Sequence, residues 1–145
     1  MKISRLLLAA FFLSASPLFA AEPPAAAPTT VPANAVKIVT IDEAQKLLQT
    51  DPKIVVIDVR TADEFQAGHI AGAKNLNIMD ADFAKQIAAL DKDTAYLVHC
   101  AAGGRSARAC AVPEVLKLKT VYHMNEGFKA WEKAGKPVEK TAPAK

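Results

Sequence analysis

The chain of 145 residues has few cysteines, few aromatic residues and no long apolar run. Two cysteines are too few to build a structural zinc site alone, and no cluster of acidic residues or histidines has metal-ligand spacing. Aromatic residues make up 6% of the chain and do not interleave with a stripe of lysines and arginines, so we expect no nucleic-acid partner. The sequence therefore predicts neither a metal protein nor a nucleic-acid-binding protein.

The apolar run at the N-terminus is too short for a comfortable membrane span, which takes about 20 apolar residues. Lys2 and Arg5 precede this run, residues 6–13, and small residues suited to cleavage follow it. The pattern predicts an export signal over residues 1–21, and hence a periplasmic or secreted protein. An uncleaved membrane anchor is the alternative. After cleavage we expect no stable membrane insertion.

Composition divides the rest of the chain into a spacer, a domain and a tail. Residues 22–35 are rich in proline, alanine and threonine and lack apolar periodicity, which is typical of a flexible spacer. Residues 36–140 have the length of one domain, and we expect residues 141–145 to be a disordered tail. The formal charge of +3 would fall to +1 if the two basic residues of the signal were removed. We expect a monomer.

Within the domain, short apolar runs alternate with helix-like segments, which predicts an α/β fold with a mainly parallel central sheet. Thr40 and Thr61 are each followed three residues later by a glutamate, the capping-box pattern that opens a helix. Apolar residues at helical spacing predict a helix around 83–90 and a last helix with Phe128 and Trp131 in the core. The predicted strands are 36–39, 54–59, 75–78, 95–99 and 120–124.

The stretch VHCAAGGRS, residues 98–106, combines a strand end, a cysteine and a series of small residues. A free thiol has a pKa of about 8.5, so Cys100 needs stabilisation of its thiolate to be a useful nucleophile at neutral pH. The next four residues have small side chains or none, so their amide groups can turn inward, with positive φ at the glycines. A helix beginning near Arg105 or Ser106 adds further amides and positive charge. We therefore predict an anion-binding cradle beyond a strand end.

Three motifs together resemble the rhodanese-like domains. They are VHCAAGGRS at 98–106, which we call the cysteine loop, DVRTADEFQAGHIAGAKNLN at 58–77 and GFKAWEKAGKPV at 127–138. They follow the family's order and spacing and span nearly the whole chain after Val36. The resemblance implies a three-layer α/β fold whose parallel sheet is flanked by helices. It also implies a sulfurtransferase without cofactor or metal. Such an enzyme moves a sulfane sulfur from thiosulfate or a similar donor to cyanide or a thiol through a persulfide, here on Cys100.

The same resemblance implies which residues form the site. Cys100 is the catalytic residue that carries the sulfur. In this family, positions such as Asp58, Arg60 and Glu64 mostly fasten the loop after their strand, yet an arginine just beyond a strand end can also face the mouth of the site. The residues expected to bind the donor are Ala101, Ala102, Gly103, Gly104, Arg105, Ser106 and Arg60.

Two alternative functions stay open. Phosphatases of the same fold need five residues between the cysteine and the arginine, whereas four separate Cys100 from Arg105, so the shorter loop favours a sulfur-sized guest. Thiosulfate-preferring relatives often carry cationic side chains where this chain has Ala101 and Ala102. The neutral loop therefore leaves open a module that carries sulfur to an exported partner protein, or docks on it, without turnover.

Two histidines in or next to the motifs are expected to be structural. His99 imitates the histidine–cysteine pair of phosphatases. Neighbouring side chains on a strand point to opposite sides, so His99 should face away from the side that Cys100 faces. His69 lies in a Gly-His-Ile turn, where a hydrogen-bonded structural role is the usual one. We therefore expect neither histidine to act as a base on the thiol.

Cys110 and Pro113 bear on the helix after the cysteine loop. A disulfide between Cys100 and Cys110 would abolish the nucleophile in an oxidising compartment. Cys110 lies more than a turn beyond the expected helix start, so its Cα should be farther from Cys100 than the roughly 7 Å that a disulfide spans. We therefore predict a buried free thiol at Cys110. Pro113 lacks an amide hydrogen and should kink or end this helix.

Overall fold

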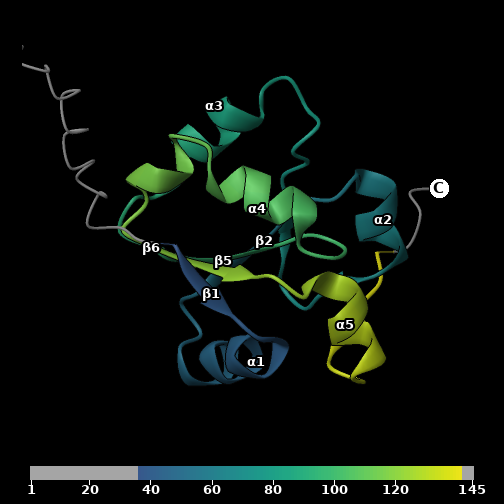
Figure 1. Ribbon diagram of the computed structural model, residues 1–145. Coiled ribbons are helices and arrows are strands. Elements are labelled where there is room, and N and C mark those ends of the chain that lie inside the picture. The colour runs from purple at the N-terminus through teal and green to yellow at the C-terminus, as the bar shows by residue number, and fades with distance from the viewer. Residues whose placement is uncertain (1–35, 142–145) are drawn as a thin grey trace, which may run out of the picture. The chain divides into compact units, whose positions relative to one another are not determined.

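The computed structural model describes residues 36–141, drawn as the coloured ribbon in Figure 1. The predicted export signal, the predicted spacer and residues 142–145 lie outside the described residues. Within 36–141, no helix is long and apolar enough to cross a bilayer. In chain order the elements are β1 (Lys37–Val39), α1 (Ile41–Thr50), β2 (Val55–Asp58), α2 (Ala62–Ala67), β3 (His69–Ile70), β4 (Lys74–Asn75), α3 (Phe83–Ala88), β5 (Ala95–His99), α4 (Gly104–Cys110), a 3-10 helix (Val115–Lys117), β6 (Thr120–Met124), α5 (Gly127–Lys133) and β7 (Val138–Glu139).

Five parallel strands form the main sheet, in the order β1-β6-β5-β2-β4. β3 and β7 form a separate antiparallel pair. β5 is paired on both sides, with Leu97 lying between Val56 of β2 and Tyr122 of β6. The predicted α/β fold with a mainly parallel sheet is confirmed. Ligands of open parallel sheets bind beyond the carboxyl ends of the strands, and the residue that follows β5 is Cys100.

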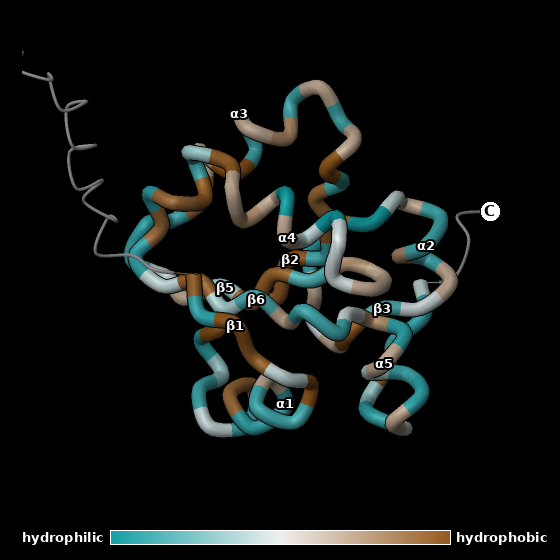
Figure 2. The backbone as a smooth tube through the Cα atoms, in the orientation of Figure 1, coloured by the Kyte–Doolittle hydropathy of each residue, from teal (hydrophilic) through white to brown (hydrophobic). Residues whose placement is uncertain are grey.

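Helices cover both faces of the sheet and give the three layers visible in Figure 1. α3 and α4 lie on one face, where Phe83 and Val98 belong to one hydrophobic core. α1 and α5 lie on the other face, where Phe128 and Trp131 pack in a second core with Leu97. Figure 2 shows brown, apolar segments in the central strands, interrupted by teal ones, between the helices. The prediction that the two aromatic residues of the last helix are core residues is confirmed.

Three helices begin or end close to where the sequence predicts. The capping boxes at Thr40 and Thr61 are both present and open α1 and α2, with each threonine hydroxyl accepting from the amide three residues later. In return, each glutamate accepts from the threonine amide, at 2.8 Å for Thr40 and 3.3 Å for Thr61. α4 begins at Gly104, slightly before the predicted start, and ends at Cys110. It therefore stops ahead of Pro113, as the missing amide hydrogen predicts.

The strands β1, β2 and β4 are shorter than the predicted runs 36–39, 54–59 and 75–78, and β4 differs most. The run at 75–78 predicts a four-residue strand, but β4 covers only Lys74–Asn75. The chain turns at Asn77, whose side-chain oxygen accepts a hydrogen bond of 3.0 Å from the Met79 amide. Asparagine forms such turns readily, and the turn ends the strand pairing early.

Candidate functional site

Cys100 directly follows β5, and its loop is pinned by the chain that enters α5. The Cys100 carbonyl accepts a hydrogen bond of 2.7 Å from the Phe128 amide, and the Ala101 carbonyl accepts one of 3.0 Å from the Lys129 amide. Gly127 permits this approach, because it has a φ of +73° and a Cβ there would lie 2.6 Å from the Ala101 backbone. The cysteine loop and the start of α5 are therefore packed backbone against backbone.

The conformational role expected of both loop glycines holds for Gly103 and is wrong for Gly104. Gly103 has a φ of +89°, and a Cβ there would lie 2.0 Å from the Asn125 carbonyl oxygen. Gly104 has no positive φ, and nothing lies within 4 Å of the position of its missing Cβ. Gly104 is the first residue of α4, where any residue can adopt the backbone angles. Only Gly103 is required by the geometry of the loop.

The Cys100 sulfur lies in a nearly closed cradle of hydrogen-bond donors. The residue is 1% exposed. The Ser106 hydroxyl is 3.4 Å from Sγ, and the backbone amides of Ala102, Arg105 and Ser106 also face the sulfur. Burial by itself raises the pKa of the Cys100 thiol, but these donors together hold that pKa below its ordinary value. The surroundings therefore favour the thiolate.

Arg105, which we expected to bind the donor, is paired with Glu64 of α2. Its two terminal nitrogens donate to the two carboxylate oxygens at 2.6 and 2.7 Å. The Arg105 hydrogen bonds are the main reason that the pKa of Glu64 falls to about 2. The pKa of Arg105 is raised, first by Glu64 and to a smaller extent by the charge on Cys100. The charge of Arg105 is therefore compensated mainly by the Glu64 carboxylate.

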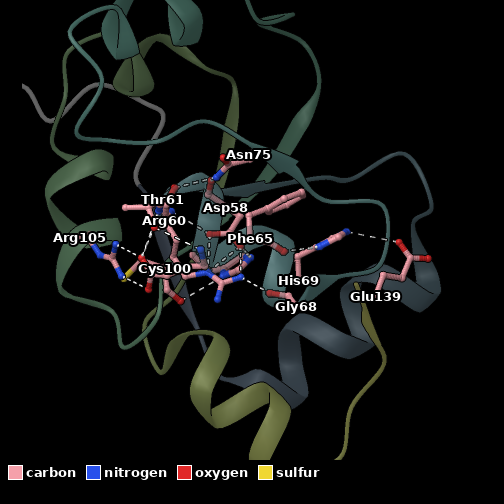
Figure 3. Close-up of polar contacts among 12 residues, drawn as sticks. Asp58, Arg60, Thr61, Phe65, Gly68, His69, Asn75, Cys100, Arg105 and Glu139 are labelled. Carbon is pink, nitrogen blue, oxygen red and sulfur yellow. Dashed lines mark hydrogen bonds and ion pairs between the residues drawn. The ribbon is translucent and has the colours of Figure 1, made fainter. Parts of the chain in front are cut away.

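Arg60 belongs to a buried cluster beside the loop, as the dashed contacts in Figure 3 show. Its guanidinium donates to Asp58 Oδ2 at 2.9 and 2.6 Å and to the Gly68 carbonyl at 2.6 Å. It also lies over the Phe128 ring, with Cζ 4.1 Å from the ring centroid. These contacts agree with the fastening role expected of Asp58 and Arg60. Arg60 and Ala101 also line a surface cavity of about 250 Å³. The predicted role of Arg60 in donor binding is compatible with this position and stays a prediction.

His99 and His69 have the structural surroundings predicted for them. His99 is fully buried, with Nδ1 3.3 Å from the Cys100 carbonyl oxygen and Nε2 3.8 Å from Asp58 Oδ2. Burial lowers the pKa of His99, so its ring is neutral near pH 7. His69 Nδ1 is 2.8 Å from the Phe65 carbonyl oxygen, and the two rings stack. Both imidazoles therefore have backbone carbonyls, and not the sulfur, as their close partners.

A third histidine lies closer to the chemistry than any motif suggested. His123 of β6 has Nε2 2.8 Å from the Ser106 hydroxyl oxygen, and that oxygen is in turn 3.4 Å from the Cys100 sulfur. One sequence signal could have found it. Alternation along β6 places His123 on the same face as Val121, which shares a core with Cys100.

Cys110 is a buried free thiol, as predicted. Both cysteines are free, so the alternative of a Cys100–Cys110 disulfide is rejected. Burial raises the pKa of Cys110 to about 12, and the nearby charge of Cys100 adds to this effect. The pKa of Cys100 is therefore lower, and that of Cys110 higher, than the pKa of an ordinary cysteine. Of the two thiols, only Cys100 is disposed to react as a thiolate.

Comparisons with known proteins find similar sequences and structures over most of the described residues. The family model of the rhodanese-like domain matches residues 40–134. The chain is 32% identical over 96 residues to an HTH-type transcriptional regulator of Mycobacterium tuberculosis, covering 63% of this chain and only 40% of that protein. It is 37% identical over 78 residues to the thiosulfate sulfurtransferase GlpE of Pseudomonas fluorescens, covering 53% of this chain and 69% of that protein. A crystal structure of a rhodanese-like domain protein from Staphylococcus aureus is similar with a TM-score of 0.62 at 27% identity, covering 74% of this chain and 100% of that one.

Proposed function

Since the chain belongs to the family of rhodanese-like domains, we propose that it is a sulfurtransferase that carries a sulfane sulfur on Cys100. The main support is the convergence of three backbone amides and the Ser106 hydroxyl on one cysteine sulfur. A persulfide concentrates negative charge on its outer sulfur, and donors that are already in place stabilise such charge without reorganisation. The likeness to a thiosulfate sulfurtransferase supports the same class of reaction.

The proposed reaction has two half-reactions. In the first, the Cys100 thiolate attacks the outer sulfur of thiosulfate. A sulfur–sulfur bond forms at Cys100, the sulfur–sulfur bond of thiosulfate breaks, and its electron pair leaves with sulfite. In the second, cyanide or a thiolate attacks the outer sulfur of the persulfide, and Cys100 leaves as a thiolate. Atoms and electrons balance without a redox cofactor, and the covalent intermediate predicts ping-pong kinetics.

A sulfur donor must reach a buried sulfur atom in a loop that offers it little free positive charge. Cys100 is 1% exposed, so only a slender terminal sulfur can reach it. Ala101 and Ala102 are neutral, and the guanidinium of Arg105 is already paired with Glu64. A thiosulfate dianion would therefore be held mainly by backbone amides, and we expect its binding to be weak.

The neutral loop also favours a second candidate function. This is a module that takes up sulfur but releases it only to a specific partner protein. A loop without free cations suits a sulfur carrier better than an enzyme selected for small dianions. The two candidates share the Cys100 persulfide and differ in the second half-reaction. Cyanide accepts sulfur from the enzyme proposed first and not from the carrier.

Thiocyanate formation from thiosulfate and cyanide tests the proposal. Wild type and Cys110→Ser should both form thiocyanate, and Cys100→Ser should form none. Cys110 is the matched control because it is the only other cysteine and is a buried free thiol. Intact-mass measurement after exposure to the donor should show the gain of one sulfur atom, which cyanide removes.

Other outcomes would separate the alternatives. A sulfur that is gained but not passed to cyanide would indicate the carrier. A chain that gains no sulfur from any sulfane donor would refute both candidates. Phosphate release from an aryl phosphate would indicate the phosphatase alternative, which the four residues between Cys100 and Arg105 disfavour.

A further inference from the structure

Ser106 lies between Cys100 and a histidine of β6. Its hydroxyl oxygen is 3.4 Å from Cys100 Sγ, 2.9 Å from the Gly103 carbonyl oxygen and 2.8 Å from His123 Nε2. Ser106 is fully buried and His123 is 6% exposed, so bulk water does not compete for these contacts. A serine hydroxyl has one hydrogen, so it donates fully to only one of its three neighbours.

The imidazole ring decides where that hydrogen goes. If His123 Nε2 carries no hydrogen, it is the nearest acceptor, Ser106 donates to it, and the sulfur loses a donor. If Nε2 carries a hydrogen, it donates to the hydroxyl oxygen and leaves the hydroxyl hydrogen for the sulfur or for the Gly103 carbonyl. Hydrogen bonds to charged acceptors are the stronger ones, so an anionic sulfur prevails over the carbonyl.

The surroundings of His123 favour a neutral ring with its hydrogen on Nε2. The Ser106 hydroxyl already faces two groups to which it can donate, the Gly103 carbonyl oxygen and the Cys100 sulfur, so the contact at 2.8 Å is best satisfied when His123 Nε2 donates to the hydroxyl oxygen. Burial lowers the pKa of His123, and no carboxylate or cation within the described residues contributes to the shift. Pairing on both sides of β6, with Val98 of β5 and Ile38 of β1 opposite His123, holds the residue in place.

We propose that His123 is a positioning residue whose Nε2 hydrogen bond turns the Ser106 hydroxyl toward the anionic Cys100 sulfur. His123 acts only through Ser106. The inference rests on the proposed role of Cys100, but the stabilisation that it describes precedes any sulfur transfer. It is therefore measurable on the thiolate alone.

The test is the pKa of the Cys100 thiol, read from the pH dependence of its alkylation by iodoacetamide. All proteins carry Cys110→Ser, so that one thiol is observed. His123→Phe should raise the pKa by about one unit, a tenfold loss of thiolate at a pH below the pKa. Ser106→Ala should raise it similarly, and His123→Phe added to Ser106→Ala should change it no further. His123→Gln keeps an N–H close to the position of Nε2 and should restore most of the wild-type value.

Two results would overturn the proposal. One is an unshifted thiol pKa in folded His123→Phe, and the other is a shift that is equally large with and without the Ser106 hydroxyl. If His123→Phe does not fold, His123→Asn replaces it, because its shorter amide does not reach Ser106 and the same shift is expected. No sulfur donor is used, so a protein that shows these shifts but forms no persulfide would refute the proposed function and uphold the role of His123.

Discussion

Alanine at the two neighbouring glycines of the cysteine loop should have opposite effects. Gly103→Ala places a Cβ 2.0 Å from the Asn125 carbonyl oxygen, and real Cβ contacts are essentially never under 3.0 Å, so the loop must move by about 1 Å or more. The φ of +89° adds about 1–2 kcal/mol for a residue with a side chain. The movement also weakens the hydrogen bonds from α5 to the Cys100 and Ala101 carbonyls, each worth about 1 kcal/mol. We expect a total loss of about 3 kcal/mol.

Urea unfolding followed by the fluorescence of the single tryptophan, Trp131, measures this loss. Gly104→Ala is the control, since its Cβ meets nothing within 4 Å and it lies at the start of α4. It should leave the free energy of unfolding unchanged or raise it by up to about 1 kcal/mol. The thiol pKa of Cys100 should rise only in Gly103→Ala, because only there do the loop amides leave the sulfur. Equal effects of the two substitutions, or a loss under about 0.5 kcal/mol for Gly103→Ala, would refute this reasoning.

Three further predictions concern two ion pairs and the N-terminus. Glu64→Gln removes the bidentate partner of Arg105 and should cost about 1 kcal/mol near neutral pH. Because the pKa of Glu64 is lowered from 4.5 to about 2, its stabilising charge is complete above pH 4.5 and is lost toward pH 2. Urea titrations across this range should therefore show wild type and Glu64→Gln converging. Asp58→Asn leaves Arg60 buried without a counter-ion and should cost about 3 kcal/mol in urea unfolding, whereas a loss below about 1 kcal/mol would contradict that role. N-terminal sequencing of the protein from its native host should begin near residue 22, and an intact Met1 would contradict cleavage of an export signal.

The fold was predictable where its signals are local. β5 and β6 lie at the predicted residues, because buried parallel strands read as apolar runs. The starts of α1 and α2 follow from Thr40 and Thr61, whose partners lie three residues away. The sulfur cradle was predictable for a similar reason, since the donors to Cys100 come from the next six residues of the chain.

The parts that the sequence did not reveal depend on contacts between distant segments. The Arg105–Glu64 pair joins residues 41 positions apart, and the Ser106–His123 contact joins residues 17 positions apart. Periodicity and spacing identify the elements but not which side chains meet across them. From the sequence alone, Arg105 is therefore predicted to be free to bind an anion. In the folded protein it is paired with Glu64 of α2.

The backbone contacts between the cysteine loop and α5 make the reactivity of the sulfur a property of the finished fold. The donors to the Cys100 and Ala101 carbonyls come from Phe128 and Lys129, close to the end of the domain. A nascent or partly unfolded chain lacks them and exposes only an ordinary thiol, which is largely protonated at neutral pH. The environment that favours the thiolate therefore depends on the docking of α5 as well as on the residues of the loop itself.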